Sequence, residues 1–130
     1  MANIKRERDI LHKFLDEFGV EGKVLIDYEV GKEFLEGIPR ELLKQYSGLS
    51  KILSKKIDAV IIAEKHYIIE VKQRLDMKQL GQLPCYKDLY AEANRINPDF
   101  IKCIAVCEHS DPMIEGCFRK RDIDIYICKP

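Results

Sequence analysis

Residues 57–72 constrain the fold more than any other segment, because they contain two short apolar runs of strand type that each carry an acid. The runs cover 57–62 and 66–72, and only three residues separate them. A gap of this length joins two antiparallel strands in a hairpin. Asp58 stands in the first run and Glu70 in the second, where a strand packed against a core carries apolar side chains. The segment therefore predicts a hairpin with charged groups at a packed site, and such groups need a chemical explanation.

The length of the hairpin loop decides whether the two acids meet. A two-residue turn at 64–65 places Asp58 opposite Val71, on the side of the sheet away from Glu70. A three-residue loop at 63–65 places Asp58 directly opposite Glu70, with about 5 Å between the β-carbons. We predict the three-residue loop. Two carboxylates this close repel each other unless a cation lies between them, and oxygen ligands favour Mg²⁺ or Mn²⁺.

Two further charged residues are candidates for the same site. Lys72 follows Glu70 by two residues, so both side chains lie on the same face of the strand, and Lys72 is expected beside the metal. Taken alone, this pair also fits an exposed surface ion pair. Glu7 lies on the apolar stripe of the first predicted helix, so it is either the solvated edge of that helix or a third carboxylate at the pocket. Glu17 is the second candidate for that role.

Helices and strands are expected on both sides of the hairpin. Asp76 is a candidate cap for a long helix that ends near residue 96. Gly81 and Pro84 predict a kink in this helix or a late start near Leu83. The other expected elements are a helix over 4–18, a strand over 24–30, short helices over 33–37 and 39–46, a strand over 101–107, a helix over 112–120 and a strand over 123–128.

This order predicts one α/β domain that covers residues 1–130. Three early strands with short links predict an antiparallel meander. The long helix then carries the chain to a strand that can pair in parallel. We therefore expect a mixed central sheet flanked by helices, in the order αβββαβ with a further helix and strand behind it.

Composition narrows the class of protein. The formal net charge is zero at pH 7, whereas dedicated nucleic-acid binders are usually basic. No segment resembles a secretory signal, and no run approaches the roughly 18 apolar residues of a membrane span. The five cysteines fit reduced thiols, and Cys103 and Cys107 are expected to be small buried side chains of a strand. We expect a soluble, cytoplasmic protein with no membrane partner.

Asp58 and the run Glu70-Val71-Lys72, placed across a hairpin within this order of strands and helices, resemble the PD-(D/E)xK nuclease superfamily. The restriction-endonuclease-like core of that superfamily consists of a helix, three strands, a helix and a strand. The resemblance covers most of residues 4–107. One departure is that Ile57 stands where the name of the motif has proline.

Two smaller motifs add to this resemblance. Gln82 and Tyr86 match the Gln-x-x-x-Tyr motif that RecB-like members carry on the helix after the lysine strand, although Pro84 lies inside it. Residues 6–11 are similar to the first helix of archaeal Holliday-junction resolvases, in which the glutamate, here Glu7, is an active-site acid.

The resemblance implies a nuclease that hydrolyses phosphodiester bonds and depends on Mg²⁺ or Mn²⁺. Asp58, Glu70 and the backbone carbonyl of Val71 are the implied ligands of the ion. Lys72 is implied to orient the attacking water or to stabilise charge in the transition state. Glu7 is implied to complete the shell of the ion or to help place a second metal.

The resemblance also assigns residues that contact the substrate. Gln82 and Tyr86 are implied to steer the nucleic-acid strand. The alternative is that Gln82 is an ordinary polar residue of the helix surface and that Tyr86 packs in the core. Basic residues become phosphate contacts, although each taken singly also fits a solvated face. These residues are Arg40, Lys44, Lys51, Lys55, Lys56, Arg119, Lys120 and Arg121.

Two other interpretations stay open. One is a catalytically inactive nucleic-acid-binding or assembly module of the same fold, and the other is a small structural or regulatory domain whose acids are solvated. Nothing in the sequence indicates base-specific recognition, so a nuclease of this kind is expected to recognise the structure or the ends of DNA. The residues do not choose between DNA and RNA. A homodimer is expected, because a junction presents two equivalent strands to a twofold enzyme.

Overall fold

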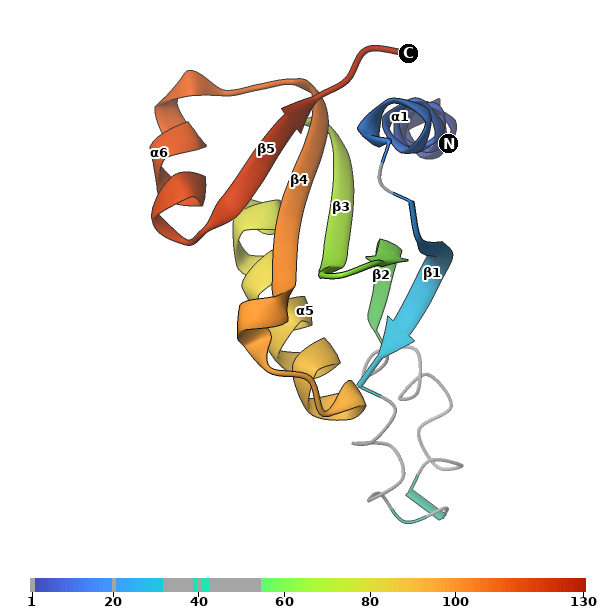
Figure 1. Ribbon diagram of the computed structural model, residues 1–130. Helices are drawn as coiled ribbons and strands as arrows, with labels where there is room; N and C mark the ends of the chain where they lie inside the picture. The colour runs from blue at the N-terminus through green and yellow to red at the C-terminus, as the bar shows by residue number, and fades with distance from the viewer. Residues whose placement is uncertain (1, 20, 32–38, 40, 43–54) are drawn as a thin grey trace.

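The computed structural model describes residues 2–19, 21–31, 39, 41–42 and 55–130 (Figure 1). The predicted helix over 33–37, most of the one over 39–46 and the cations Arg40, Lys44 and Lys51 lie outside these residues. The elements of the described part are α1 (Ala2–Phe18), β1 (Lys23–Val30), β2 (Lys55–Ile62), β3 (His66–Arg74), α5 (Met77–Asn94), the 3₁₀ turn η1 (Pro98–Phe100), β4 (Ile101–His109), α6 (Pro112–Lys120) and β5 (Ile123–Ile127).

The strands of the described residues form one mixed sheet in the order β1-β2-β3-β4-β5. The pairs β1–β2 and β2–β3 are antiparallel, whereas β4 lies parallel to β3 and β5 lies parallel to β4. Helix α5 connects β3 to β4, and α6 connects β4 to β5, as parallel neighbours require. The predictions of an α/β fold and of a mixed sheet flanked by helices are therefore confirmed.

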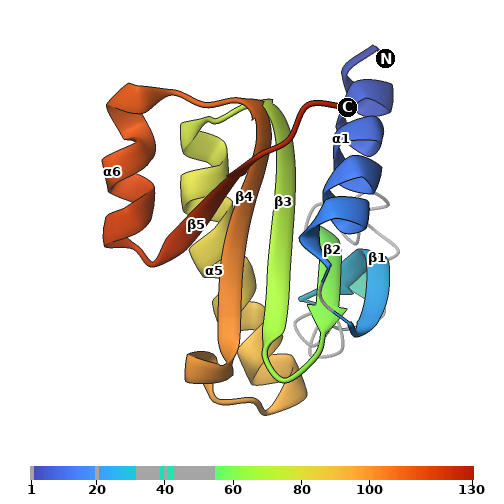
Figure 2. The same ribbon diagram turned by 45° about the horizontal axis from the view of Figure 1, so that its top comes forward.

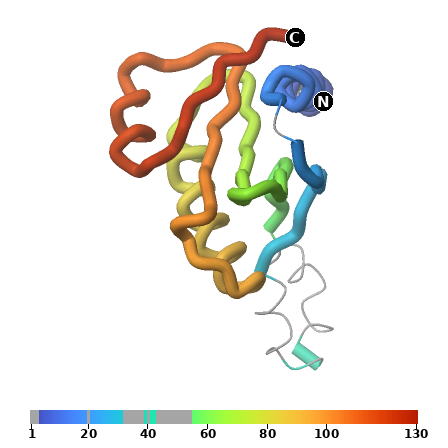
Figure 3. Tube along the Cα trace, in the orientation of Figure 1, coloured from blue at the N-terminus to red at the C-terminus, as the bar shows by residue number. Residues whose placement is uncertain are grey.

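The helices cover opposite faces of this sheet. Helix α1 lies on one face, and α5 and α6 lie on the other (Figures 1 and 2). Each face has its own apolar cluster. The cluster under α1 contains Ile10 and Phe14, and the cluster under α5 and α6 contains Leu83, Tyr90 and Phe118. Figure 3 traces the two crossovers, both of which run over the face opposite to α1.

Helix α5 begins at Met77 because Asp76 and Gln79 cap its first turn reciprocally. The N–H of Gln79 donates to Oδ1 of Asp76 at 3.0 Å, and the N–H of Asp76 donates to Oε1 of Gln79 at 3.2 Å. This capping box satisfies two backbone donors that the helix leaves unpaired. The helix continues through Gly81 and Pro84. The prediction that Asp76 caps this helix is therefore confirmed, and the alternative of a late start near Leu83 is wrong.

Helix α1 is attached to the sheet near both of its ends. Near the start, Arg6 binds Glu108 at the end of β4 through two contacts, one of them Nε–Oε2 at 3.0 Å. Near the end, the rings of Phe14 and Phe18 contact that of Tyr126 with centroid distances of 4.9 and 6.2 Å. These attachments fix which face of α1 points at the strands.

Two further expectations concern composition. Cys103 and Cys107 are buried in β4, as predicted, and the cysteines are free thiols. None of the helices in the described part of the chain has the length and hydropathy that a membrane crossing requires.

Candidate active site

The β2–β3 hairpin has the predicted three-residue loop. The N–H of Ala63 donates to the carbonyl of Lys65 at 3.0 Å and closes this loop. The strands then pair from Ile62 with His66 to Ala59 with Ile69. Continued by one residue, this register places Asp58 opposite Glu70. The predicted register is therefore confirmed.

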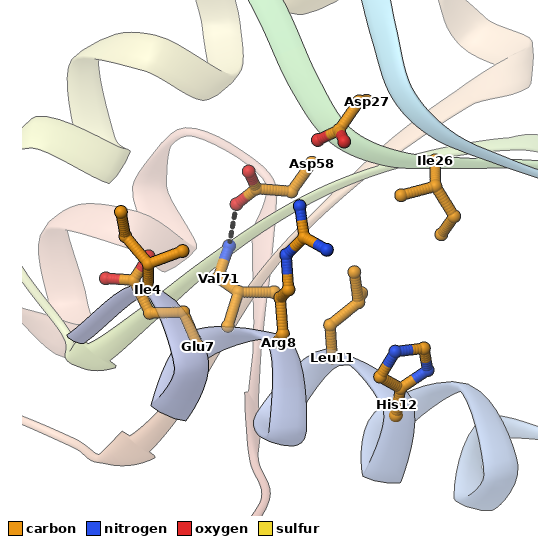
Figure 4. A pocket seen from close by; sticks show the side chains of 9 residues that line it. All are labelled: Ile4, Glu7, Arg8, Leu11, His12, Ile26, Asp27, Asp58 and Val71. Carbon is orange, nitrogen blue, oxygen red and sulfur yellow. Dashed lines mark hydrogen bonds between the residues drawn. The ribbon is translucent and has the colours of Figure 1, made fainter. Parts of the chain in front are cut away.

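At the next position along the hairpin, side chains replace the backbone ladder. The N–H of Asp58 donates to Oε1 of Glu70 at 2.9 Å, and the N–H of Val71 donates to Oδ2 of Asp58 at 2.8 Å. Each carboxylate thus binds the backbone of the other strand, and Figure 4 shows the second of these bonds. Because backbone atoms of a sheet are fixed, both carboxylates are held in defined positions.

The ladder between β1 and β2 is interrupted at the same residue. Ile26 pairs with Ala59 and Tyr28 pairs with Ile57, but the pairing skips Asp27 and Asp58. Asp27 has a φ of 52°, in the left-handed region that side chains other than glycine, asparagine and aspartate rarely adopt. This local distortion leaves Asp58 outside the regular ladder on both of its sides.

A pocket of about 270 Å³ opens between α1 and the strands at this point (Figure 4). Glu7 lines it, as predicted, whereas Glu17 pairs with Lys13 and accepts from the hydroxyl of Tyr126. The full lining is Ile4, Glu7, Arg8, Leu11 and His12 from α1, Ile26 and Asp27 from β1, Asp58 from β2 and Val71 from β3.

Sequence reasoning missed Asp27, Arg8 and His12 as pocket residues. Arg8 and His12 are four residues apart, so the helical period places these two side chains on one side of α1, one above the other. For Asp27 the only signal was an acid in the first predicted strand. Its approach to Asp58 depends on the left-handed backbone, which no sequence pattern indicated.

Burial and mutual repulsion change the proton affinity of the acids. The Glu70 side chain is buried, with an exposed fraction of 3% for the residue. Burial, followed by the nearby Asp58, raises the pKa of Glu70 to about 8. Burial also raises the pKa of Asp58 and that of Glu7, and in each of the three groups the ammonium of Lys72 opposes the shift. Lys72 therefore lies close to all three carboxylates.

The donor set suits a hard divalent ion. Asp58 and Glu70 each accept from backbone through one carboxylate oxygen, and the two carboxyl groups are within hydrogen-bond reach of each other, so both can present oxygen to one ion. Among the described residues, no group of three or more acidic, histidine or cysteine side chains is close enough to hold an ion. Two carboxylates are sufficient for Mg²⁺, which keeps several waters and binds substrate phosphate. The assignment of Asp58, Glu70 and Val71 as ligands, and of Glu7 as a helper, stays a prediction.

Helix α5 brings Tyr86 toward the carboxylates from the other face. Tyr86 is buried, and burial, followed by Glu70 and Asp58, raises its pKa to about 12. Gln82 and Tyr86 line a second pocket of about 450 Å³, which also includes Lys55. Oε1 of Gln82 is buried there without a hydrogen bond to the described residues. The predicted contact of Gln82 and Tyr86 with substrate stays untested.

The predicted phosphate contacts fall in two places. Lys55 and Lys56 are exposed at the start of β2. Arg119, Lys120 and Arg121 lie at the end of α6, on the face opposite to α1 (Figure 1). Arg119 pairs with Glu115 at 3.0 Å, and Arg121 donates to the carbonyl of Cys117. The α6 cluster is thus separated from the pocket under α1 by the sheet.

The fold is similar to that of a repair endonuclease from Pyrococcus abyssi with a known crystal structure. The superposition has a TM-score of 0.62 with 12% sequence identity, and it covers 98% of this chain and 47% of that chain. The chain therefore spans about half the length of that protein. No protein-family model and no curated protein sequence matches the chain. At this identity, the similarity establishes a shared fold.

Proposed function

We propose that this chain is a metal-dependent nuclease of the PD-(D/E)xK type that hydrolyses phosphodiester bonds of DNA. One observation carries the proposal: Asp58 and Glu70 bind each other's strands, so a half-buried and a buried carboxylate lie side by side near Lys72. The raised pKa of Glu70 supports it, because a buried acid that resists ionisation gains most from a bound cation. The endonuclease with the same fold adds an independent argument.

In the proposed mechanism, Asp58, Glu70 and the carbonyl of Val71 would hold the ion. A bound Mg²⁺ or Mn²⁺ supplies charge neutralisation of the phosphate and a bound water of lowered pKa. Lys72 donates to the attacking water or to a phosphate oxygen, and it stabilises the negative charge that develops there. Glu7 accepts from water across the pocket and so orients the nucleophile. Arg8, which lines the same pocket, is placed to contact a phosphate.

The proposed substrate is DNA recognised by its structure or its ends. The pocket has both acidic and basic side chains, and the chain has no net charge, so an extended track of phosphate contacts is not favoured. Lys72 beside both carboxylates favours an active enzyme over a binding module of the same fold. A twofold dimer remains part of the proposal, and light scattering of the purified protein measures it directly.

Cleavage assays test the proposal. The protein is incubated with Mg²⁺ or Mn²⁺ and with supercoiled, linear, single-stranded and branched DNA and with RNA. We expect cleavage of at least one DNA substrate, and we expect loss of cleavage with a chelator or with Asp58→Asn. A calorimetric Mn²⁺ titration accompanies the assays. No cleavage of any substrate, together with no Mn²⁺ binding that depends on Asp58, would overturn the proposal.

A further inference from the structure

We propose that Gln79 is a positioning residue of this site and that it acts through the peptide group between Glu70 and Val71. The sequence motifs did not single out Gln79, which precedes Gln82 by one helical turn. The inference rests on the proposed function only in that the same peptide group joins two proposed metal ligands. The contacts of Gln79 are independent of that function.

The carboxamide of Gln79 is fully buried and joins three segments of the chain. Its Nε2 donates to the carbonyl of Glu70 at 3.1 Å and to that of Val106 at 3.3 Å. Its Oε1 accepts from the N–H of Asp76 at 3.2 Å. Val106 lies on β4 beside Val71 in the parallel register. Gln79 therefore links the start of α5 to β3 and β4 at the level of the site.

The peptide group between Glu70 and Val71 is held from both sides. Its carbonyl accepts from Gln79, and its N–H donates to Oδ2 of Asp58. Because a peptide group is planar, fixing both of its polar atoms fixes its orientation. That orientation sets the direction of the Glu70 side chain on one side and of the Val71 backbone on the other. Gln79 thus holds the carbonyl of this peptide group, and Asp58 holds its N–H.

Glutamine has the chemistry that this position needs. Two carbonyl oxygens and one N–H face the side chain, so it must offer two donors and one acceptor in a buried place. Methionine has a similar volume but offers neither a donor nor a strong acceptor. Asparagine keeps the amide, yet it is one methylene shorter and does not span the three partners.

The test compares Gln79→Met with Asp76→Ala. Asp76→Ala removes the cap that accepts from the N–H of Gln79, but it leaves the backbone N–H of residue 76 and all three contacts of the Gln79 carboxamide. Both variants weaken the start of α5. Only Gln79→Met also removes a contact of the peptide group at the site. Gln79→Asn replaces Gln79→Met where the latter does not fold.

The readouts are hydrogen exchange of the Val71 amide without metal, Mn²⁺ affinity, and kcat and KM on a cleaved DNA. For Gln79→Met we expect exchange at Val71 to accelerate more than tenfold relative to Ile61 and Ile104, and Mn²⁺ affinity to fall by about 10- to 100-fold. We expect kcat to fall with KM for DNA unchanged. Asp76→Ala is expected to lower the unfolding temperature and to leave Mn²⁺ affinity and Val71 protection within twofold of wild type.

Two results would overturn the inference. One is a Gln79→Met protein that loses stability but keeps wild-type protection at Val71 and wild-type Mn²⁺ affinity, because Gln79 is then purely structural. The other is an equal loss of Mn²⁺ affinity in both variants. A wild-type protein that cleaves nothing and binds no Mn²⁺ rejects the proposed function instead, and the exchange at Val71 still decides the role of Gln79.

Discussion

The strand half and the helix half of the candidate site are held in different ways. Asp58 and Glu70 lie on adjacent strands of one hairpin, and each accepts from a backbone N–H of the other strand. Glu7, from α1, lines the pocket that Asp58 also lines, and its side chain makes no hydrogen bond within the described residues. Its place depends on how the helix packs on the sheet, through its buried residues Ile10 and Phe14 and the bond from Arg6 to Glu108. The sheet therefore fixes one half of the site locally, and long-range packing fixes the other.

The largest expected effect comes from removing the ammonium group of Lys72 in the strand half. We expect Lys72→Ala to lower kcat by at least about 100-fold, because it removes a donor aimed at developing charge, with only a modest loss of DNA binding. Single-turnover cleavage and a binding titration measure the two effects. Lys102→Ala is the matched control, since Lys102 lies on β4 away from the pocket and pairs there with Asp122. Equal losses of cleavage and binding in Lys72→Ala would contradict a catalytic role.

The helix half is expected to respond less, and through two residues at once. We expect Glu7→Ala and Arg6→Ala each to lower kcat by about tenfold. Glu7→Ala removes the carboxylate, and Arg6→Ala displaces it by loosening the attachment of α1. The double variant is expected to lose no more than either single one. Kinetics of the three proteins measure this coupling. Additive losses would show that Arg6 does not act through Glu7.

The pH dependence of stability sharpens the comparison, because the pKa of Glu70 in the strand half is raised more than that of Glu7 in the helix half. The pKa of Glu70 rises from its ordinary value to about 8 in the folded state. Between these values the folded state binds a proton that the unfolded state has lost, so stability without metal falls as pH rises toward 8. Above that pH, both states are deprotonated and the fall stops.

Glu70→Gln is expected to remove the part of this dependence that comes from Glu70. At pH 8.5 and without metal, we expect the variant to unfold about 5 °C or more above wild type, with the difference shrinking toward pH 5. Thermal melts in a chelator measure it, and Glu115→Gln on α6 is the control, since the pKa of Glu115 is lowered by its bonds to Ser110 and Arg119. A constant difference at every pH would show that the buried charge is not its cause.

The smallest expected effect concerns the backbone beside Asp58. Asp27 has a left-handed φ, so glycine is expected to stabilise the fold there or leave it unchanged, and Asp27→Val to destabilise it by about 1–2 kcal/mol. Urea unfolding measures both. An equal cost for glycine and valine would show that the carboxylate of Asp27, and not its backbone, matters to the fold.

The same contrast explains what sequence could predict. The register of Asp58 and Glu70 followed from strand periodicity and loop length, which are local properties. The ion pair of Arg6 with Glu108 joins residues 102 positions apart, and no local pattern indicates it. Gln79 was missed because its burial depends on how α5 packs against two strands. Asp76 was correctly predicted to cap α5, whereas the late start near Leu83, the alternative suggested by Gly81 and Pro84, is wrong because the capping box at Asp76 fixes the first turn.

The distortion at Asp27 also affects how this molecule behaves among its own copies. Strand β1 forms one border of the sheet that the described residues make, and the aliphatic side chains of Val24 and Ile26 on it are exposed. A straight border of this kind invites another chain to add a strand and begin aggregation. The left-handed turn of the backbone at Asp27 breaks the even spacing of outward donors and acceptors, and a charged carboxylate stands at the break. We therefore expect the irregularity that frees Asp58 from the ladder also to hinder intermolecular sheet growth.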